Sequence, residues 1–267
     1  MILVTESSRR YCGCFLHCEN PCVRGFHNVR SIFRKPEDKK KETETMIGII
    51  EVYGSMLLRA LGQTLLLTLL SLLFAMVIGM IFGLMNVGHN RVLNLIGTIY
   101  VDAVRGVPLI VLAYFIYFGV PAGMQGLGFS SFRLNALQAG TAALSMNCGA
   151  YMAEIIRAGI ESVDRGQMEA ARSLGLSYSS SMALVVIPQA VRTMIPSIIN
   201  QFIITLKDTS ILSIIGFPEL TNVGKTIVGN TLKSLQTWAI VGVMYMVVIV
   251  TLSKVAKRIE RRVNRGR

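Results

Sequence analysis

The sequence predicts an all-α membrane protein with five membrane-spanning helices. Hydrophobic residues make up 52% of the 267 residues, and charged residues make up 16%, against about 25% in soluble domains. The apolar residues gather in runs of roughly 20, the length that crosses the hydrocarbon core of a bilayer as a helix. This composition excludes a disordered chain, a basic nucleic-acid-binding domain and an ordinary soluble enzyme.

Five apolar stretches are predicted to span the membrane. An amphipathic segment, 46–58, precedes the first span, and we expect it to lie at the membrane interface. The third span is rich in small residues, which permit close helix packing, so we expect protein to enclose it. The predicted spans are 61–85, 95–120, 136–156, 191–215 and 235–252. The small residues of the third span are Gly140, Ala142, Ala143, Ser145, Gly149 and Ala150.

The basic C-terminal tail sets the predicted orientation. Residues 254–267 hold seven Lys or Arg residues and one acidic residue, Glu260. A basic segment directly after a span is typical of the cytoplasmic side, where it also attracts membrane lipid of negative charge. With five spans, the N-terminus of the first span then lies outside. We find no internal sequence repeat, which disfavours a secondary transporter.

The first 45 residues differ from the rest of the chain. They contain four of the five cysteines and two of the three histidines, namely Cys12, Cys14, Cys18, Cys22, His17 and His27. Such clusters are typical of zinc sites, but the spacing C-x-C-x3-C-x3-C lacks the paired C-x2-C of common zinc modules. We therefore expect no metal site, and instead a disordered extension or a segment before the true start at Met46. A transmembrane domain, 46–253, and a basic tail, 254–267, follow.

Several charged residues fall inside the predicted spans, where a charge costs about 2.5–3.5 kcal/mol and so indicates a functional site. Asp102 and Arg105 lie three residues apart, and Glu154 and Arg157 have the same spacing. This spacing places each pair on one helical face. We predict that they form intramembrane ion pairs near helix ends.

Lys207 and Asp208 are adjacent within the fourth apolar run. Adjacent residues point about 100° apart on a helix, so these two cannot simply neutralise each other. We expect them to line a polar pathway, in which one cation and one anion suit a zwitterionic ligand. Asn147 in the third span either adds hydrogen bonds to this pathway or forms a polar contact between helices.

The chain shows no catalytic arrangement of residues. No Ser–His or His–Cys–Asp constellation occurs in the sequence. Segment 219–226 resembles a phosphate-binding loop only in part, because Glu219 stands where the motif needs glycine and the segment lies between two spans. We therefore predict a protein that is not an enzyme, has no cofactor or nucleotide site, and depends on a partner for energy.

The polar segment between the third and fourth spans carries the most informative pattern. Glu169, Ala170 and Ala171 fall in a short predicted helix that ends at Gly175, since glycine is common just after a helix. Pro188 begins the next predicted element. A structured polar helix between two spans indicates a docking element for a cytoplasmic partner rather than an ordinary surface loop.

This pattern, E-A-A-x3-G followed by I-P about a dozen residues later, resembles the cytoplasmic signature of ABC importer permeases. Three further runs resemble the polar amino-acid permeases, the histidine/glutamine/arginine group. They are Y-V-D-x2-R-G-x-P-L from Tyr100, A-Y-x-A-E-x2-R from Ala150 and L-K-D-T-S from Leu206. The motifs keep the family's order over residues 61–262. Two features depart from the family: Val107 replaces the usual threonine, and residues 1–45 have no counterpart.

The resemblance implies the five-span ABC importer permease fold, with a cytoplasmic coupling helix in segment 158–190, between spans three and four. The implied coupling residues are Gly166, Gln167, Glu169, Ala170, Ala171, Gly175 and Pro188. The implied substrate pathway contains Asn147, Lys207 and Asp208, with Gln201 and Thr205 beside them.

The resemblance also implies the partners and the function. The chain would be the permease subunit of an importer in the bacterial cytoplasmic membrane, moving a polar or charged amino acid by alternating access. Separate ABC ATPase subunits would bind ATP, an extracytoplasmic binding protein would deliver the amino acid, and a second permease copy or relative would complete the dimer. A stand-alone secondary transporter or channel for small polar solutes is the alternative. The sequence does not specify which amino acid is carried.

Overall fold

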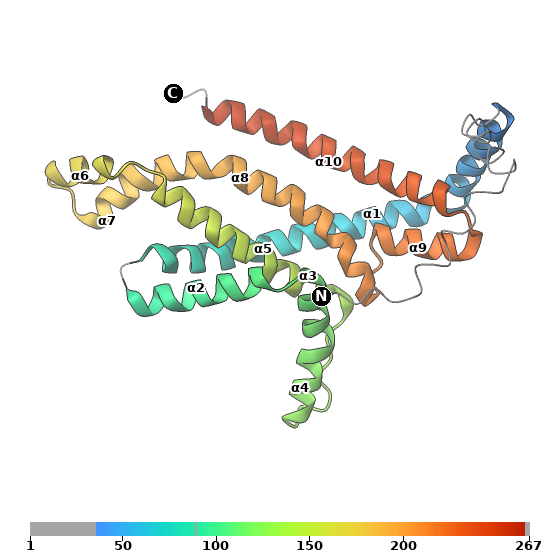
Figure 1. The fold of residues 1–267 in the computed structure, drawn as a ribbon, viewed down its shortest axis with the longest axis horizontal. Helices are drawn as coiled ribbons and strands as arrows, with labels where there is room; N and C mark the ends of the chain where they lie inside the picture. Colours follow the sequence, from blue (N-terminus) through green and yellow to red (C-terminus); the bar gives the residue numbers. More distant parts are fainter. Residues whose placement is uncertain (1–35, 89, 265–267) are drawn as a thin grey trace, which may run out of the picture. The chain divides into compact units, whose positions relative to one another are not determined.

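The computed structural model describes residues 36–88 and 90–264, and every regular element in these two ranges is a helix (Figure 1). The all-α prediction is therefore confirmed. The chain divides into two units, Met1–Gly48 and Ile49–Arg267. The cysteine and histidine cluster, for which we weighed a metal site, lies outside the described residues.

Helix α1, Pro36–Val87, begins in the first unit. Residues 36–45 are therefore helical, and the expectation of disorder is wrong for these ten residues. The local sequence explains the helix, because proline suits a first helical position and the Glu and Lys residues after it favour helix formation. The predicted domain boundaries after residues 45 and 253 stay predictions.

The second unit contains the rest of α1 and all later elements. Four of the predicted spans lie on α1, on α5, on α8 continued by η5, and on α10. The elements after α1 are α2 (Arg91–Gly106), α3 (Leu109–Tyr114), the π-helix η3 (Phe115–Gly119), α4 (Val120–Gly126), α5 (Ala136–Glu161), α6 (Arg165–Ser173), α7 (Tyr178–Ser181), the π-helix η4 (Met182–Val186), α8 (Ile187–Asp208), the 3-10 helix η5 (Thr209–Ile215), α9 (Leu220–Thr231) and α10 (Ser234–Asn264).

The second predicted span, 95–120, is wrong as a single helix. Helix α2 ends at Gly106, Val107 is extended with φ −99° and ψ 129°, and α3 begins directly after Pro108. Proline disfavours the helical conformation for the residue before it, so the chain leaves the helix at Val107. Beyond the break, the helical path continues through η3 and α4.

Four helical stretches in the described part of the chain are long and apolar enough to cross a membrane: Met46–Val87, Leu109–Gly126, Tyr178–Ile215 and Ser234–Arg258. The predicted third span, α5, is not among them. Its 26 residues are nevertheless about 39 Å long at 1.5 Å per residue, which exceeds the hydrocarbon thickness of about 30 Å. The count of five spans stays a prediction.

Helix α5 is enclosed by other helices. It packs against α2, α3 and α8, and most of its residues are buried. On its α1 side, Gly79 and Gly83 come so close to α5 that an added Cβ would overlap Met152 or Ile156. The sequence-based expectation that protein surrounds this span is confirmed, because small side chains on both helices allow the backbones to approach.

In the second unit, several turns and helix ends lie together on one side (Figure 1). The turn between α1 and α2, the hairpin of α6 and α7, and the end of α10 lie toward one end of the helices. Helices α1, α5 and α10 run toward this end, whereas α2 and α8 run away from it. The polar hairpin described below lies at this shared end.

Candidate functional site

A buried polar contact joins α5 to α8 inside the second unit. The Thr205 hydroxyl lies 2.9 Å from the Gln201 carbonyl oxygen and 3.2 Å from the Cys148 sulfur. All three residues are buried. This contact places two of the predicted pathway residues, Gln201 and Thr205, on the side of α8 that faces α5.

Asn147 precedes Cys148 on α5 and is 8% exposed. Its side-chain amide forms no hydrogen bond to any other residue that the structure describes. An amide carries two donor hydrogens and an acceptor oxygen. Asn147 therefore offers unused hydrogen-bonding capacity beside the contact between α5 and α8.

Lys207 and Asp208 occupy the last two positions of α8. Asp208 follows Thr205 by three residues and Gln201 by seven, so it continues the same helical face and is partly buried. Lys207 points about 100° away and is exposed. Within the described residues, neither side chain forms an ion pair, and no hydrogen bond joins either of them to Asn147. Their role in a pathway stays a prediction.

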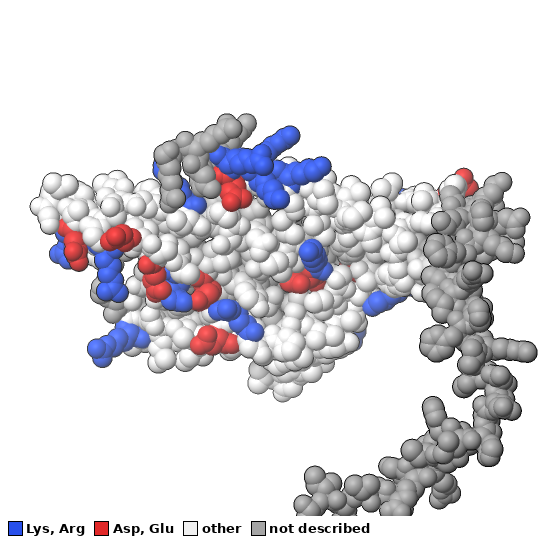
Figure 2. Space-filling model, turned by 45° about the horizontal axis from the view of Figure 1, so that its top comes forward, with Lys and Arg blue, Asp and Glu red and all other residues white. Residues whose placement is uncertain are grey.

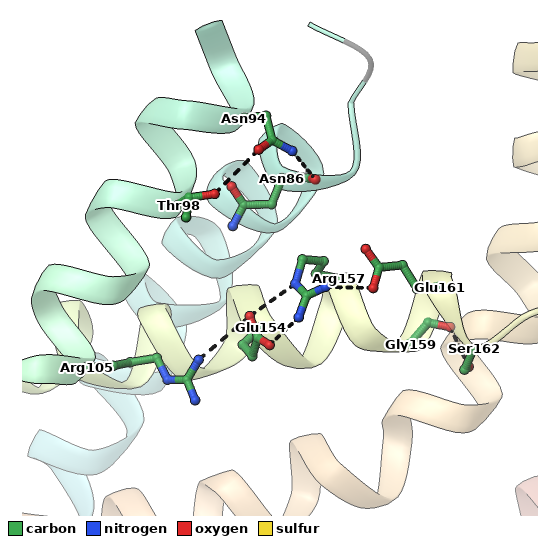
Figure 3. Close-up of polar contacts among 9 residues, drawn as sticks. All are labelled: Asn86, Asn94, Thr98, Arg105, Glu154, Arg157, Gly159, Glu161 and Ser162. Carbon is green, nitrogen blue, oxygen red and sulfur yellow. Dashed lines mark hydrogen bonds and ion pairs between the residues drawn. The ribbon is translucent and has the colours of Figure 1, made fainter. Parts of the chain in front are cut away.

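A charged network joins α2 to α5 (Figure 3). The two oxygens of Glu154 accept from the Arg157 guanidinium at 2.5 and 3.2 Å, and Arg157 also donates to Glu161 at 2.6 Å. Arg105 on α2 approaches Glu154 to 3.7 Å, with its guanidinium 5.2 Å from the centre of the Tyr151 ring. Glu154 thus lies between two cations from two helices.

The expected pairing of Asp102 with Arg105 is wrong. Arg105 contacts Glu154 on α5 instead, and Asp102 has no ion pair with any other described residue. The spacing of three residues allowed the local pair, but the packing of α2 on α5 supplies a carboxylate that sequence spacing could not reveal. Arg157 pairs with Glu154 at the predicted spacing.

Helix α6 is anchored on one side and exposed on the other. The Asp164 carboxylate caps it by accepting from the Gly166 N–H at 2.7 Å. Met168 packs on the cluster of Ile156, Ile160, Val186, Ala190 and Met194, and Ala171 is buried. Glu169 and Ala170 are exposed. The helix therefore presents part of the predicted coupling motif on its outer face.

The end of α6 is shaped by a glycine turn. Gly175 has φ +88°, a left-handed conformation that glycine adopts without a Cβ clash. The N–H of Leu176 donates to the Ala171 carbonyl at 3.3 Å, which closes the helix. As a result Leu174 is 85% exposed at the tip of the hairpin, where an apolar side chain is available to a partner.

A side-chain hydrogen bond ties α6 to the start of α8. Gln189 donates to the Gln167 side-chain oxygen at 3.1 Å. Pro188, the second residue of α8, is exposed. Residues 178–215 form an unbroken helical run through η4, α8 and η5, so Pro188 lies within this run rather than at its beginning. The hairpin is thereby connected to the helix that carries Gln201, Thr205 and Asp208.

Sequence reasoning missed a second polar cluster around Glu219. This fully buried carboxylate caps α9 by accepting from the N–H groups of Thr221 and Asn222 at 2.7 and 2.6 Å, and from the Tyr245 hydroxyl at 2.8 Å. Burial raises the pKa of Glu219, although these hydrogen bonds oppose the shift. Glutamate is not among the residues preferred at an N-cap, so the sequence carried no strong signal for this role.

The segment 219–226 is not a phosphate loop. A 3-10 helix precedes it, whereas the motif requires a strand. Lys225 donates to the Ser213 hydroxyl at 2.8 Å and so serves a contact within the protein. Among the described residues, no group of three or more His, Cys, Asp or Glu side chains is placed to hold a metal ion.

Residues 75–265 match the family described as binding-protein-dependent transport system inner membrane component. The chain is 34% identical over 207 residues to the glutamine transport system permease protein GlnP of Escherichia coli (strain K12), covering 78% of this chain and 92% of the relative. It is 35% identical over 213 residues to the probable glutamine ABC transporter permease protein GlnM of Bacillus subtilis (strain 168), covering 79% and 95%. The arginine transport system permease protein ArtQ of the same organism is 32% identical over 206 residues, covering 77% and 91%.

Solved structures show the same fold. The crystal structure of an amino acid ABC transporter with histidines superposes with a TM-score of 0.75 at 36% identity, covering 81% of this chain and 98% of the other. The MetNI methionine ABC transporter, at 22% identity and a TM-score of 0.68, supports the fold alone. As a permease subunit, the chain is a non-catalytic membrane component. It belongs to the family of binding-protein-dependent transport system inner membrane components, and the resemblance to ABC importer permeases inferred from its motifs is confirmed.

Proposed function

We propose that the chain is the permease subunit of an ATP-driven importer for a polar or charged amino acid. The observation that carries this proposal is the similarity to glutamine and arginine permeases, which extends over 91–95% of the length of the three relatives named above. The geometry supports the proposal, because an anchored polar hairpin is connected to helices that carry buried polar groups.

The hairpin of α6 would transmit movement of an ATPase partner to the membrane helices. Its outer face, with Glu169, Ala170 and Leu174, would contact the ATPase. Its inner contacts, Met168 on the apolar cluster and Gln167 on Gln189, would pass a displacement to α5 and α8. Because packed helices move as rigid bodies, a push on α6 would tilt both helices and alternate the side from which the pathway is open.

The pathway would run beside the contact between α5 and α8. Asp208 would attract the ammonium group of an amino acid, and Lys207 its carboxylate. Asn147, Gln201 and Thr205 would supply polar groups along the way. The Asn147 amide supports this role, because it forms no hydrogen bond to a described residue and so can form one to a passing substrate.

The proposal includes the partners and the orientation implied by the resemblance. An extracytoplasmic binding protein delivers the amino acid, and a second permease copy or relative completes the translocation unit. ATPase subunits bind at the hairpin of α6 in the cytoplasm. The basic end of α10 then lies in the cytoplasm of a bacterium, in agreement with the positive-inside rule.

The test is uptake into proteoliposomes that contain the chain, its cognate ATPase and its binding protein. Each of a panel of labelled amino acids is offered with and without ATP inside the vesicles. Uptake that requires ATP and all three components is expected, and the panel identifies the substrate. Uptake by the chain alone would instead establish a secondary transporter or channel and overturn the proposal.

A further inference from the structure

An apolar groove of about 770 Å³ lies on the second unit between α1, α8 and α10. Its volume falls in the range of about 300–1,000 Å³ that small-ligand sites have. Leu69, Leu73 and Val247 line it and are 67%, 62% and 58% exposed, so the groove is open to the surroundings of the helices. The proposed transport mechanism makes no use of it.

The polar atoms in the groove are already satisfied within their own helices. The Thr68 hydroxyl donates to the Thr64 carbonyl at 2.7 Å, and the Thr251 hydroxyl donates to the Val247 carbonyl at 2.7 Å. The groove therefore presents hydrocarbon and little hydrogen-bonding capacity. A polar substrate would lose its hydration there without compensation, so the occupant must itself be apolar where it contacts the groove.

The helical face that lines the groove becomes basic toward the end of α10. Val247, Thr251 and Val255 line the groove. Lys254 lies three residues after Thr251, and Arg258 lies three residues after Val255, so both continue this face. Arg261 follows at the same spacing. All three basic side chains are exposed, and none forms an ion pair with another side chain that the structure describes.

Figure 2 shows several Lys and Arg side chains gathered on the upper surface of this view, with a smaller acidic patch among them. From Val247 to Arg258 the helix rises about 16 Å at 1.5 Å per residue. Half of a hydrocarbon core of about 30 Å is about 15 Å. The groove and the basic residues are therefore spaced like the acyl chain and the headgroup of a lipid in one leaflet.

We propose that this groove binds an anionic phospholipid, with an acyl chain against Leu69, Leu73 and Val247 and its phosphate among Lys254, Arg258 and Arg261. Charge complementarity favours this occupant over a second copy of the chain. Three exposed cations, Lys254, Arg258 and Arg261, lie beyond the apolar lining, and a lipid phosphate supplies the matching anion while its acyl chain fills the groove. The proposal does not depend on the transported substrate.

The test uses phosphatidylglycerol with a photoreactive group in its acyl chain and the full chain in lipid nanodiscs. We expect cross-links in the α1 and α10 segments that line the groove. Unlabelled phosphatidylglycerol should compete at least fivefold better than phosphatidylcholine. Arg258→Gln should reduce labelling about fivefold, since one basic residue near an anionic surface contributes about that factor. Lys257→Gln, which removes the same charge from a face turned away from the groove, should change labelling less than twofold.

A second pair of variants tests the groove itself. Leu73→Trp fills it and should abolish labelling of α10, whereas Ile96→Trp on the exposed face of α2 should leave it unchanged. Gel filtration checks that both variants remain monodisperse. Equal competition by the two lipids, equal effects of the two charge variants, or cross-links between two copies at the groove would each overturn the proposal.

Discussion

Within residues 36–88 and 90–264, Glu154 takes part in two of the three ion pairs that the structure shows, one with Arg105 and one with Arg157. It accepts two hydrogen bonds from Arg157 and faces Arg105 on another helix. Its own side chain is 30% exposed, so solvent screens these interactions in part. Glu154 therefore contributes to the packing of α2 on α5, and it balances the charges of Arg105 and Arg157.

Replacing Glu154 tests that position. Glu154→Gln leaves Arg105 and Arg157 without a shared anion, and we expect a loss of about 1 kcal/mol, which lowers Tm by about 2–4 °C for a chain of this size. Thermal unfolding of the purified protein in detergent measures this change. Glu161→Gln is the control, because it removes only the more exposed partner of Arg157, and a Tm shift as large as that of Glu154→Gln would contradict the prediction.

Asp208 is the titratable residue on the α5-facing side of α8. Asp208→Asn keeps the size of the side chain and removes its charge. If Asp208 attracts the ammonium group of the substrate, ATP-dependent uptake should fall at least tenfold while the ATPase still co-purifies with the permease. An unchanged uptake rate with intact assembly would remove Asp208 from the pathway.

At the scale of elements, small residues decide how α1 and α5 meet. Gly149 on α5 faces Ile78 on α1, and a Cβ at this glycine would lie 2.7 Å from an Ile78 methyl carbon. Ser145 donates to the Ser71 carbonyl at 3.2 Å, a bond that needs the same close approach. Helix α1 therefore carries small residues where it meets the small residues of α5, which allows the close packing predicted for α5.

Gly83→Leu tests this packing. An added Cβ lies 2.9 Å from the Ile156 Cβ, so the substitution should cost about 1–3 kcal/mol by overpacking. Thermal unfolding should show a Tm several degrees lower. Gly62→Leu on the same helix is the control, because no atom lies within 4 Å of its added Cβ. Equal Tm values for the two variants would argue against a tight contact at Gly83.

Helix α6 is the element that we expect to meet the ATPase. Glu169→Lys reverses a charge on its exposed face without disturbing Met168 or Ala171, which anchor it. We expect loss of ATPase co-purification and of uptake, with normal membrane insertion. Glu51→Lys makes the same charge change on the exposed surface of α1 and should leave assembly intact. Normal uptake by Glu169→Lys would exclude the docking role.

At the scale of the whole molecule, the directions of the helices in Ile49–Arg267 determine which segments share a side of the membrane. The hairpin of α6 and the end of α10 lie toward the same end (Figure 1). Any ATPase that binds the hairpin must therefore lie on the side that the basic tail reaches. The orientation of the tail then decides on which side of the membrane such an ATPase would lie.

This orientation has a direct test. A green fluorescent protein fused after Arg267 should fluoresce in intact cells, and alkaline phosphatase fused at the same position should be inactive, because the basic tail favours the cytoplasm. Inserting the phosphatase in the loop between α9 and α10 should give an active enzyme. The opposite pattern of activities would reverse the predicted topology.

The sequence by itself determined the all-helical membrane class, the family and the short helix α6, because each rests on local information. Long apolar runs, a collinear set of motifs and a glycine that ends a helix are visible without tertiary contacts. The proline rule would also have placed the break at Val107, but the apolar run across it concealed the boundary.

Tertiary structure alone decided the partners of the charged and polar side chains. Arg105 could pair with Asp102 on its own helix or with a carboxylate 49 residues away, and only the packing of α2 on α5 selects Glu154. The same holds for Glu219, whose Tyr245 partner lies 26 residues further along the chain. Periodicity in sequence reports which face of a helix is apolar, whereas contacts between helices depend on how those faces meet in three dimensions.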